Sequence, residues 1–138
     1  MKRGRRVAFD YGDARIGLAI CDPDGILATP LPFLDAKHPK LMSKISDLFT
    51  EYEPIHIYLG KPLHLSGSEG AATAKVDHFA EKLRSQFDIP ITMIDERLST
   101  VGAQRKLREA GKNTKDSRQL IDSMAAVAIL EAGLAHES

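Results

Sequence analysis

Three acidic residues stand where the surrounding sequence is apolar. Asp10 follows Val-Ala-Phe, Glu96 closely follows the run IPITMI, and Asp122 falls in the stretch QLIDSMAAVAILEAGLA. An unpaired carboxylate is costly to bury, so a buried one must be paired or must bind a metal ion. Taken alone, Asp10 also fits a turn, and Asp122 fits the first turn of a helix, where the dipole favours an acid. Glu96 alone also fits a pair with its neighbour Arg97.

The three acids together indicate a site for a divalent cation. In sheets with parallel strands, ligand sites lie at the carboxyl ends of the strands, where both Asp10 and Glu96 are expected. If their strands are adjacent and parallel, both carboxylates reach one ion, and Asp122 on a following helix completes the set. Carboxylate oxygens without histidine or cysteine suit Mg²⁺ or Mn²⁺. Two such ions activate water and stabilise the leaving oxygen in phosphodiester cleavage, which needs no protein nucleophile.

Hydrophobic periodicity and turn signals predict the elements that position these acids. Strands are expected at residues 5–10, 15–21, 26–34, 55–59 and 89–94. Helices are expected at residues 39–53, 72–87, roughly 100–110 and roughly 118–134. Two tight turns join the first three strands into an antiparallel meander, and the third is an edge strand because its prolines cannot donate to a ladder. The later units add strands in parallel, which predicts an α/β fold in the order β-β-β-α-β-α-β-α, with a mixed five-stranded sheet and helices on both faces.

Length and composition limit the class of protein. With 138 residues, 43% of them apolar, residues 1–138 are expected to form a single domain. The balance of 19 basic and 19 acidic residues excludes a polybasic tail protein and an acidic disordered one. One cysteine, Cys21, excludes a disulfide framework and fits a reducing compartment. The sequence has no long apolar run and no signal peptide, so a cytoplasmic protein without a membrane partner is expected.

Basic residues gather in the segment that follows Glu96. Residues 97–118 hold seven basic and two acidic side chains, a net charge of +5. A charge run is often a solvated helix face, but the position of this one between Glu96 and Asp122 favours contacts with the phosphates of a polyanion. A second basic cluster, at residues 2–6, either binds nucleic acid or keeps the terminus soluble.

Residues outside this segment are also candidates for phosphate contacts. Lys61 and Ser66 lie in the loop of residues 60–70, which precedes a helix whose free N–H groups suit a phosphate. A capping segment with Ser68 at the N-cap is an equal alternative. Arg15 either contacts phosphate or pairs with Asp13. The predicted substrate-binding residues are Arg15, Lys61, Ser66, Arg97, Arg105, Lys112 and Lys115.

Four segments of the chain resemble one protein family. They are AFDYGDARIGLAICD (8–22), LGKPLHLSGSEG (59–70), DERLST (95–100) and IDSMAAVAIL (121–130). Their combination resembles the YqgF/RuvX family, RNase H-like proteins described as pre-16S rRNA nucleases or Holliday junction resolvases. Lys61 departs from the family pattern, in which an apolar residue stands in a G-L-P-L motif, so the resemblance does not imply the shape of that loop.

The resemblance implies a fold, a site and a process. The fold is similar to that of RNase H, and Asp10, Glu96 and Asp122 match the family's catalytic, metal-binding positions, with Mg²⁺ or Mn²⁺ as the implied cofactor. The implied activity is metal-dependent phosphodiester hydrolysis in 5′-end maturation of the 16S rRNA precursor, hence ribosome biogenesis in the bacterial cytoplasm. The implied partner of the monomer or homodimer is precursor RNA, alone or in ribosomal particles. Branched DNA, for a junction resolvase, is the older alternative.

Two other classes of function fit parts of the sequence. An actin-like or sugar-kinase-like phosphotransferase opens with a similar D-x-G turn, but it needs two such domains, and 138 residues are too few for both. A non-catalytic RNA- or ribosome-binding module would keep the fold without turnover, although the presence of all three acids disfavours it. Convergence of Asp10, Glu96 and Asp122 in one cleft is the geometry expected of a nuclease.

Overall fold

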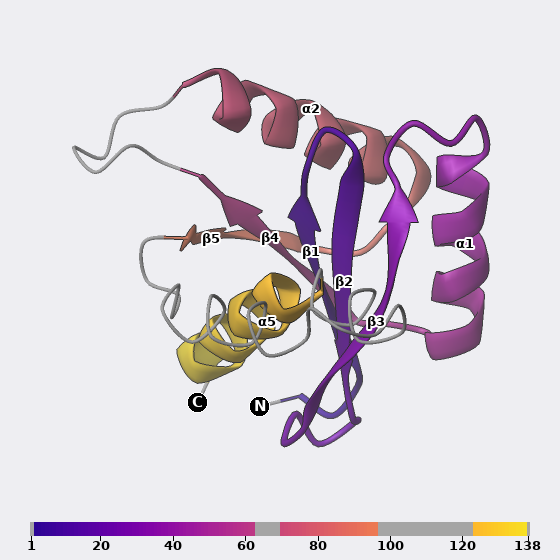
Figure 1. Ribbon diagram of the computed structural model, residues 1–138. Coiled ribbons are helices and arrows are strands. Elements are labelled where there is room, and N and C mark those ends of the chain that lie inside the picture. Colours follow the sequence, from indigo (N-terminus) through magenta and orange to yellow (C-terminus); the bar gives the residue numbers. More distant parts are fainter. Residues whose placement is uncertain (1, 63–69, 97–122, 138) are drawn as a thin grey trace, which may run out of the picture.

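A five-stranded mixed sheet with helices on both faces organises the chain (Figure 1). The computed structural model describes residues 2–62, 70–96 and 123–137. Its elements are β1 (Arg6–Tyr11), β2 (Arg15–Cys21), β3 (Ala28–Asp35), α1 (Leu41–Tyr52), β4 (His56–Lys61), α2 (Ala71–Gln86), β5 (Ile91–Asp95) and α5 (Met124–Glu137). The strand order is β3-β2-β1-β4-β5, with α1 and α2 on one face of the sheet and α5 on the other. Within these described ranges no helix has the length and apolar character needed to cross a membrane.

Strand pairing confirms the predicted sheet. β1 pairs antiparallel with β2, and β2 with β3, whereas β4 pairs parallel with both β1 and β5. β3 lies at an edge, as its prolines predict. The predicted helix at roughly 100–110 and the start of the last helix at 118 lie outside the described residues.

The third strand begins at Ala28, two residues later than predicted. The cause is the preceding turn, where the carboxylate of Asp22 accepts hydrogen bonds from the N–H groups of Ile26 (2.8 Å) and Leu27 (2.6 Å). Short acidic side chains hold turns in this way by bonding to the backbone a few residues on. The apolar character of Ile26 and Leu27 suggested a strand, but both side chains are exposed.

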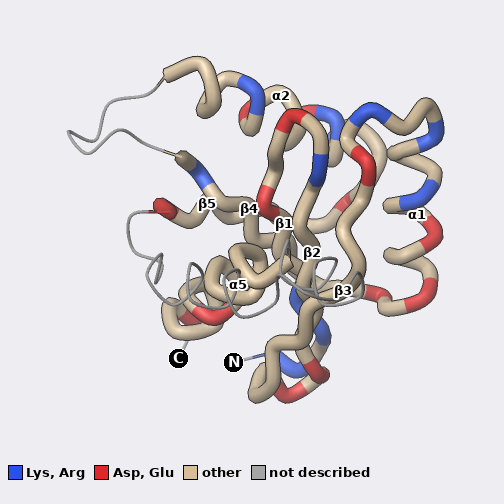
Figure 2. The backbone as a smooth tube through the Cα atoms, viewed as in Figure 1, with Lys and Arg blue, Asp and Glu red and all other residues tan. Residues whose placement is uncertain are grey.

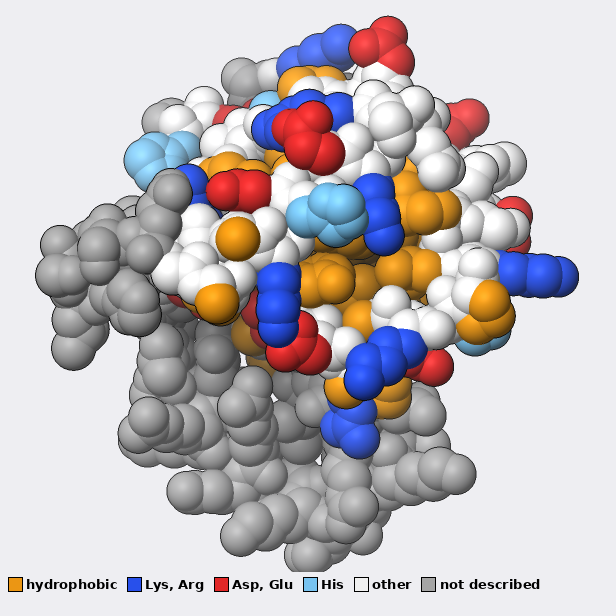
Figure 3. Space-filling model, turned by 90° about the horizontal axis from the view of Figure 1, so that it is seen from above, with side chains coloured by type: hydrophobic (Ala, Val, Ile, Leu, Met, Phe, Trp, Pro, Cys, Tyr) orange, Lys and Arg blue, Asp and Glu red, His pale blue; other side chains and the backbone are white. Residues whose placement is uncertain are grey.

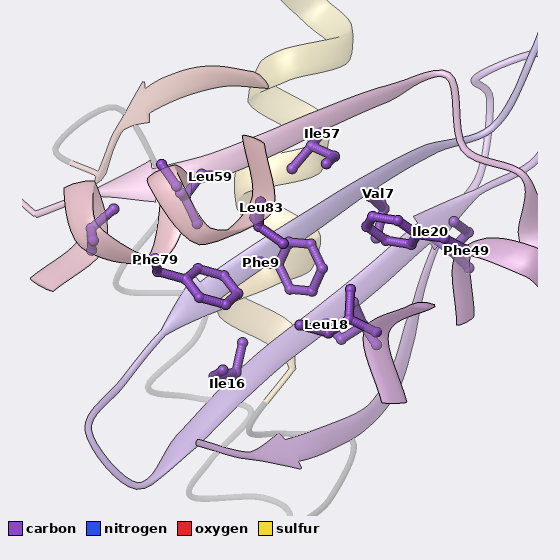
Figure 4. Packing of buried hydrophobic residues seen from close by; sticks show 13 residues of the cluster. Val7, Phe9, Ile16, Leu18, Ile20, Phe49, Ile57, Leu59, Phe79 and Leu83 are labelled. Atoms are coloured by element: carbon purple, nitrogen blue, oxygen red, sulfur yellow. The ribbon is translucent and has the colours of Figure 1, made fainter. Parts of the chain in front are cut away.

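The side chains of β1 alternate between the two faces of the sheet. Val7 and Phe9 are buried on the side of α1 and α2, and Figure 4 shows them among the apolar side chains of that cluster. Ala8 is buried against α5. Because successive side chains in a strand point to opposite faces, Asp10 lies on the same face as Ala8. The fold therefore presents Asp10 on the α5 side of the sheet.

The start of α2 corrects the predicted helix cap. Gly70, in an extended conformation, occupies the N-cap position, where it has no side chain to cap the helix. The alternative that places Ser68 at the N-cap is therefore wrong, and glycine is well accepted at this position. The buried Thr73 ties the first turn of α2 to the end of β4, because its hydroxyl donates to the carbonyl of Pro62 (2.5 Å).

Arg6, a member of the N-terminal basic cluster, attaches the end of α5 to the sheet. Its side chain is only 1% exposed, and its Nη2 pairs with Oε1 of Glu137 at 2.9 Å. The hydroxyl of Tyr58 donates to the same carboxylate. Arg6 is thus a structural residue. For Arg6, both alternatives predicted for the cluster, nucleic-acid binding and solubility of the terminus, are wrong.

Replacing Arg6 is expected to destabilise the fold. Arg6→Met leaves the partly buried carboxylate of Glu137 without its partner, so the free energy of unfolding should fall by about 3 kcal/mol. Arg3→Met is the control, because the pair of Arg3 with Asp24 (3.1 Å) is exposed and should contribute less than about 1 kcal/mol. Urea unfolding of both variants measures the difference, and equal losses would contradict the structural role of Arg6.

Candidate active site

Two of the three predicted acids lie together at one end of the sheet. Asp10 is the penultimate residue of β1, and Glu96 directly follows the last residue of β5. Their side chains share a hydrogen bond. The two strands run in the same direction but are not adjacent, because β4 lies between them. The carboxyl groups therefore meet across β4, so the condition that their strands be adjacent is not met, whereas the condition that they be parallel is.

Gly60 in β4 makes this meeting possible. A Cβ atom on Gly60 would lie 2.7 Å from Oε1 of Glu96 and 2.5 Å from Cδ1 of Ile129 in α5. Both distances are too short for real contacts, so any side chain here would push away the ends of the Glu96 and Ile129 side chains. A glycine inside a strand often marks such a close approach. The sequence predicts a loop from residue 60 onward, whereas Gly60 lies within β4, and a glycine directly after the apolar run IHIYL is the signal for this role.

The surroundings of Glu96 favour its protonated form. Burial, then the charge of Asp10 and its hydrogen bond, and then the charge of Asp95 raise the pKa of Glu96 to about 7. A hydrogen bond between two carboxyl groups requires one proton. Without a cation, Asp10 and Glu96 therefore share a proton near neutral pH, and a cation that takes its place would satisfy both groups.

Metal-free protein should become more stable when Glu96 cannot ionise. Because the pKa of about 7 in the folded state lies above the usual value of 4.5, ionisation of Glu96 disfavours folding. The favourable contribution of the protonated group is complete below pH 4.5 and is lost as the pH rises through 7. In EDTA at pH 8, Glu96→Gln should be about 1–2 kcal/mol more stable than the wild type, a value reduced for its partial exposure.

Urea unfolding in EDTA at two pH values checks this expectation. The advantage of Glu96→Gln should be present at pH 8 and should largely vanish near pH 4, where wild-type Glu96 is mostly protonated in both states. Asp47→Asn, at an exposed position of α1, provides a matched control that should show no such change between the two conditions. A wild type more stable than Glu96→Gln at pH 8 would contradict the buried acid pair.

The donors of the acid pair fit a hard divalent cation. Carboxylate oxygens are the preferred ligands of Mg²⁺, which is commonly held by one or two carboxylates while water and substrate phosphates complete its shell. Asp10 and Glu96 supply two such groups at one point. In the part of the chain that the structure describes, no group of three or more His, Cys, Asp or Glu side chains could hold a metal ion. Asp122, the predicted third ligand, lies outside that part.

Ser123, which the sequence analysis did not single out, anchors the chain close to the acid pair. It immediately precedes α5 and is 0% exposed. Its hydroxyl accepts a hydrogen bond from the N–H of Leu18 in β2 (3.1 Å). Leu18 follows Gly17, which is the Cα partner of Asp10. The residue that directly follows Asp122 in the chain is therefore fixed on the strand that pairs with Asp10.

Lys61 is one of the two predicted substrate-binding residues that the structure describes. It ends β4 and is the Cα partner of Asp95, so it lies at the end of the sheet that carries the acid pair. The predicted substrate-binding residues outside the described ranges are Ser66, Arg97, Arg105, Lys112 and Lys115.

Arg15, the other described candidate, lies at the start of β2, directly after the turn that follows β1. Its guanidinium lies over the ring of Phe33, 5.1 Å from the ring centre. Asp13, the alternative partner of Arg15, pairs with Lys75 of α2 at 2.8 Å.

Charges of both signs occur around the candidate site. Figure 2 shows a basic position at the end of β4 beside acidic positions at the end of β5. Seen from above, basic and acidic side chains surround an apolar area of the described surface, and no patch of one sign dominates (Figure 3). This mixture agrees with the balanced charge of the whole chain. The strongly basic segment of residues 97–118 lies outside the described residues.

Comparisons of the sequence and of the fold with known proteins agree with the family resemblance described above. The family described as "RuvX: Holliday junction resolvase" matches residues 4–136. A protein of Streptomyces avermitilis named "Putative pre-16S rRNA nuclease" is 48% identical over 139 residues, which cover 99% of this chain and 89% of the relative. A protein of Streptomyces coelicolor with the same name is 46% identical and is covered to 83%.

The sheet and helices are also similar to a solved structure. Thermus thermophilus RuvC, solved in complex with a Holliday junction substrate, superimposes with a TM-score of 0.55 at 13% identity, covering 96% of this chain and 95% of that one. At this identity the likeness shows the fold alone, and it confirms the predicted RNase H-like architecture.

Proposed function

Because the chain belongs to the RuvX family, we propose that it is a metal-dependent nuclease that hydrolyses phosphodiester bonds at the 5′ end of the 16S rRNA precursor. The observation that carries the proposal is the pair of facing carboxyl groups of Asp10 and Glu96, which meet over Gly60. The names of the relatives, which cover nearly the whole chain at 46–48% identity, support precursor rRNA as the substrate. The protein would then act in ribosome biogenesis in the bacterial cytoplasm, on free RNA or on precursor particles.

We assign Asp10, Glu96 and Asp122 as the residues that would hold Mg²⁺ or Mn²⁺. When bound, the cation would supply a Lewis acid for the scissile phosphate and lower the pKa of a coordinated water. The part of Asp10 and Glu96 is to fix the position of the cation, and to bring negative charge that the cation neutralises. Burial of Glu96 against α5 strengthens these charge interactions, because they act in a medium less polar than water.

The basic residues would hold the phosphate backbone beside this site. Lys61 and Arg15 lie at the same end of the sheet as the acids, and Ser66 belongs to the adjoining loop segment in the sequence. Arg97, Arg105, Lys112 and Lys115 follow Glu96 directly in the chain. Such contacts position a nucleic acid without reading its sequence.

Neutralising two lysines of the basic segment should weaken RNA binding. Lys112→Gln/Lys115→Gln removes two phosphate contacts, so the slope of log Kd against log salt should fall by about 1.5. Fluorescence anisotropy with a labelled precursor RNA in EDTA measures this slope without cleavage. Lys2→Gln/Arg3→Gln removes the same charge from the N-terminal cluster, and an equal effect of both double variants would contradict a specific role for the segment.

A second candidate function, Holliday junction resolution, is favoured by the description of the matching family. One experiment separates the two functions. Purified protein with Mg²⁺ or Mn²⁺ is incubated with precursor 16S RNA that carries its 5′ extension, and separately with a four-way DNA junction. We expect shortening of the RNA and an intact junction. Cleavage of the junction alone would establish the alternative, and binding of RNA without cleavage of either substrate would favour a non-catalytic module.

A further inference from the structure

We propose that Ser123 is a positioning residue, which fixes the start of α5 on the sheet so that Asp122 is delivered to the metal site. The inference rests on the proposed function, because it takes Asp122 as a ligand. Its new element is the role of a buried hydroxyl group that neither the acid motif nor the family resemblance singles out.

The hydroxyl of Ser123 joins α5 to two strands at once. It accepts a hydrogen bond from the N–H of Leu18 in β2 (3.1 Å) and donates one to the carbonyl of Leu31 in β3 (2.5 Å). Ser123 is 0% exposed, so water does not compete for either bond. A single side chain therefore sets the position of the helix start relative to both strands.

These bonds lie where the ladder between β2 and β3 is irregular. Ile16 pairs with Leu34 and Leu18 pairs with Leu31, so the register shifts between the two pairs. Irregular pairing of this kind leaves backbone groups without their ladder partners and is frequent next to active sites. The Ser123 hydroxyl bonds to Leu18 and to Leu31, the pair that follows the shift. The start of α5 is therefore attached to the sheet at this point.

Ser123 uses its hydroxyl for the sheet rather than for its own helix. Its carbonyl accepts the N–H of Val127 (3.1 Å), so Ser123 begins the helical hydrogen-bond pattern. A serine in this position ordinarily turns its hydroxyl to the free N–H groups of the first turn. Here both described hydrogen bonds of the hydroxyl lead to strands, which indicates that this residue serves placement of the helix rather than capping.

The anchored point is next to Asp10 in the sheet. Leu18 follows Gly17, and Gly17 is the cross-strand partner of Asp10. Paired Cα atoms of antiparallel strands are about 4.5–5.5 Å apart, and consecutive Cα atoms are about 3.8 Å apart. The backbone N–H that binds Ser123 is therefore only one residue and one strand away from Asp10, and Asp122 is the residue before Ser123 in the chain.

The test measures Mn²⁺ affinity by calorimetry, together with thermal unfolding, in four proteins. Ser123→Ala should weaken Mn²⁺ binding by about tenfold, the lower end of the effect seen when residues that orient metal ligands are removed. Thr73→Val is the matched control, because it removes another buried hydroxyl bonded to a backbone carbonyl, at 2.5 Å from Pro62. It should lower the unfolding temperature to a similar degree and leave Mn²⁺ affinity within about twofold of the wild type. The other two proteins are the wild type and Asp122→Asn. Asp122→Asn should weaken Mn²⁺ binding at least as much as Ser123→Ala.

The outcomes separate the inference from the function on which it rests. Unchanged Mn²⁺ affinity in Asp122→Asn would remove Asp122 from the ligand set and refute that part of the proposed function. Weaker binding in Asp122→Asn with wild-type affinity in Ser123→Ala would overturn the positioning role alone. Should Ser123→Ala not fold, Ser123→Cys keeps most of the volume with only a weak donor and acceptor. It should bind Mn²⁺ at least about threefold more weakly, and wild-type affinity in that variant would overturn the inference equally.

Discussion

Asp10→Asn is expected to reduce cleavage of precursor RNA by at least about 10³-fold, the scale of loss when an essential group of a catalytic site is removed. The amide is almost the same shape as the carboxyl group and can keep a hydrogen bond to Glu96. It has no negative charge, however, and a carboxylate is the donor that a hard cation prefers. The variant should therefore keep its fold and lose its affinity for Mn²⁺ together with its activity.

The stability of Asp10→Asn distinguishes loss of function from loss of fold. The charge of Asp10 is one of the causes that raise the pKa of Glu96, so its removal should relieve repulsion in metal-free protein. Asp10→Asn should then be at least as stable as the wild type in EDTA at pH 8, as is common when a strained functional site is neutralised. Cleavage assays and urea unfolding on the same preparations measure both quantities.

Asp24→Asn is the matched control for the cleavage assay. It makes the same chemical change at an exposed acid whose carboxylate pairs with Arg3, near the opposite end of β1. Its activity should stay within about twofold of the wild type, as expected of a surface change. Equal activity of Asp10→Asn and the wild type would show that the cleavage comes from another site or from a contaminant.

The acid pair could be predicted from the sequence because short stretches of neighbouring residues indicate it. Asp10 and Glu96 each follow an apolar run, and the alternation of strands and helices predicts that such runs end at the same edge of a sheet. The strand order is not local, because it depends on which apolar faces pack against each other. For this reason the sequence could predict that the acids meet, but not that β4 lies between them.

The supporting residues could not be predicted because their roles exist only in the folded chain. Ser123 and Leu31 are 92 positions apart, and nothing in the stretch around either residue indicates the other. Arg6 looked like one member of a basic cluster, yet its partner Glu137 is at the far end of the sequence. In each case a common residue type acquired its function from a contact between distant segments, which composition and spacing do not record.

Gly60→Ala is expected to damage the acid pair more than the fold. The new methyl group would lie 2.7 Å from Oε1 of Glu96 and 2.5 Å from Cδ1 of Ile129, so both must move. Overpacking of this kind typically destabilises a protein by about 1–3 kcal/mol. Because Glu96 would be pushed away from Asp10, we also expect Mn²⁺ affinity to fall about tenfold and cleavage about 100-fold, since small displacements of a catalytic group have effects of this size.

Gly133→Ala separates these two effects, because it crowds the same helix against the same strand without touching an acid. A Cβ atom on Gly133 in α5 would lie 2.6 Å from the ring of Tyr58 in β4, so the packing between α5 and the sheet should suffer to a similar extent. Urea unfolding should show comparable losses for the two variants, whereas Mn²⁺ calorimetry and RNA cleavage should be impaired in Gly60→Ala only. If Gly133→Ala lost as much metal affinity and activity as Gly60→Ala, the absence of a side chain at Gly60 would serve only the packing of α5 on the sheet. The difference in Mn²⁺ affinity and cleavage rate between the two variants therefore measures how much the absence of a side chain at Gly60 contributes to the contact between Asp10 and Glu96.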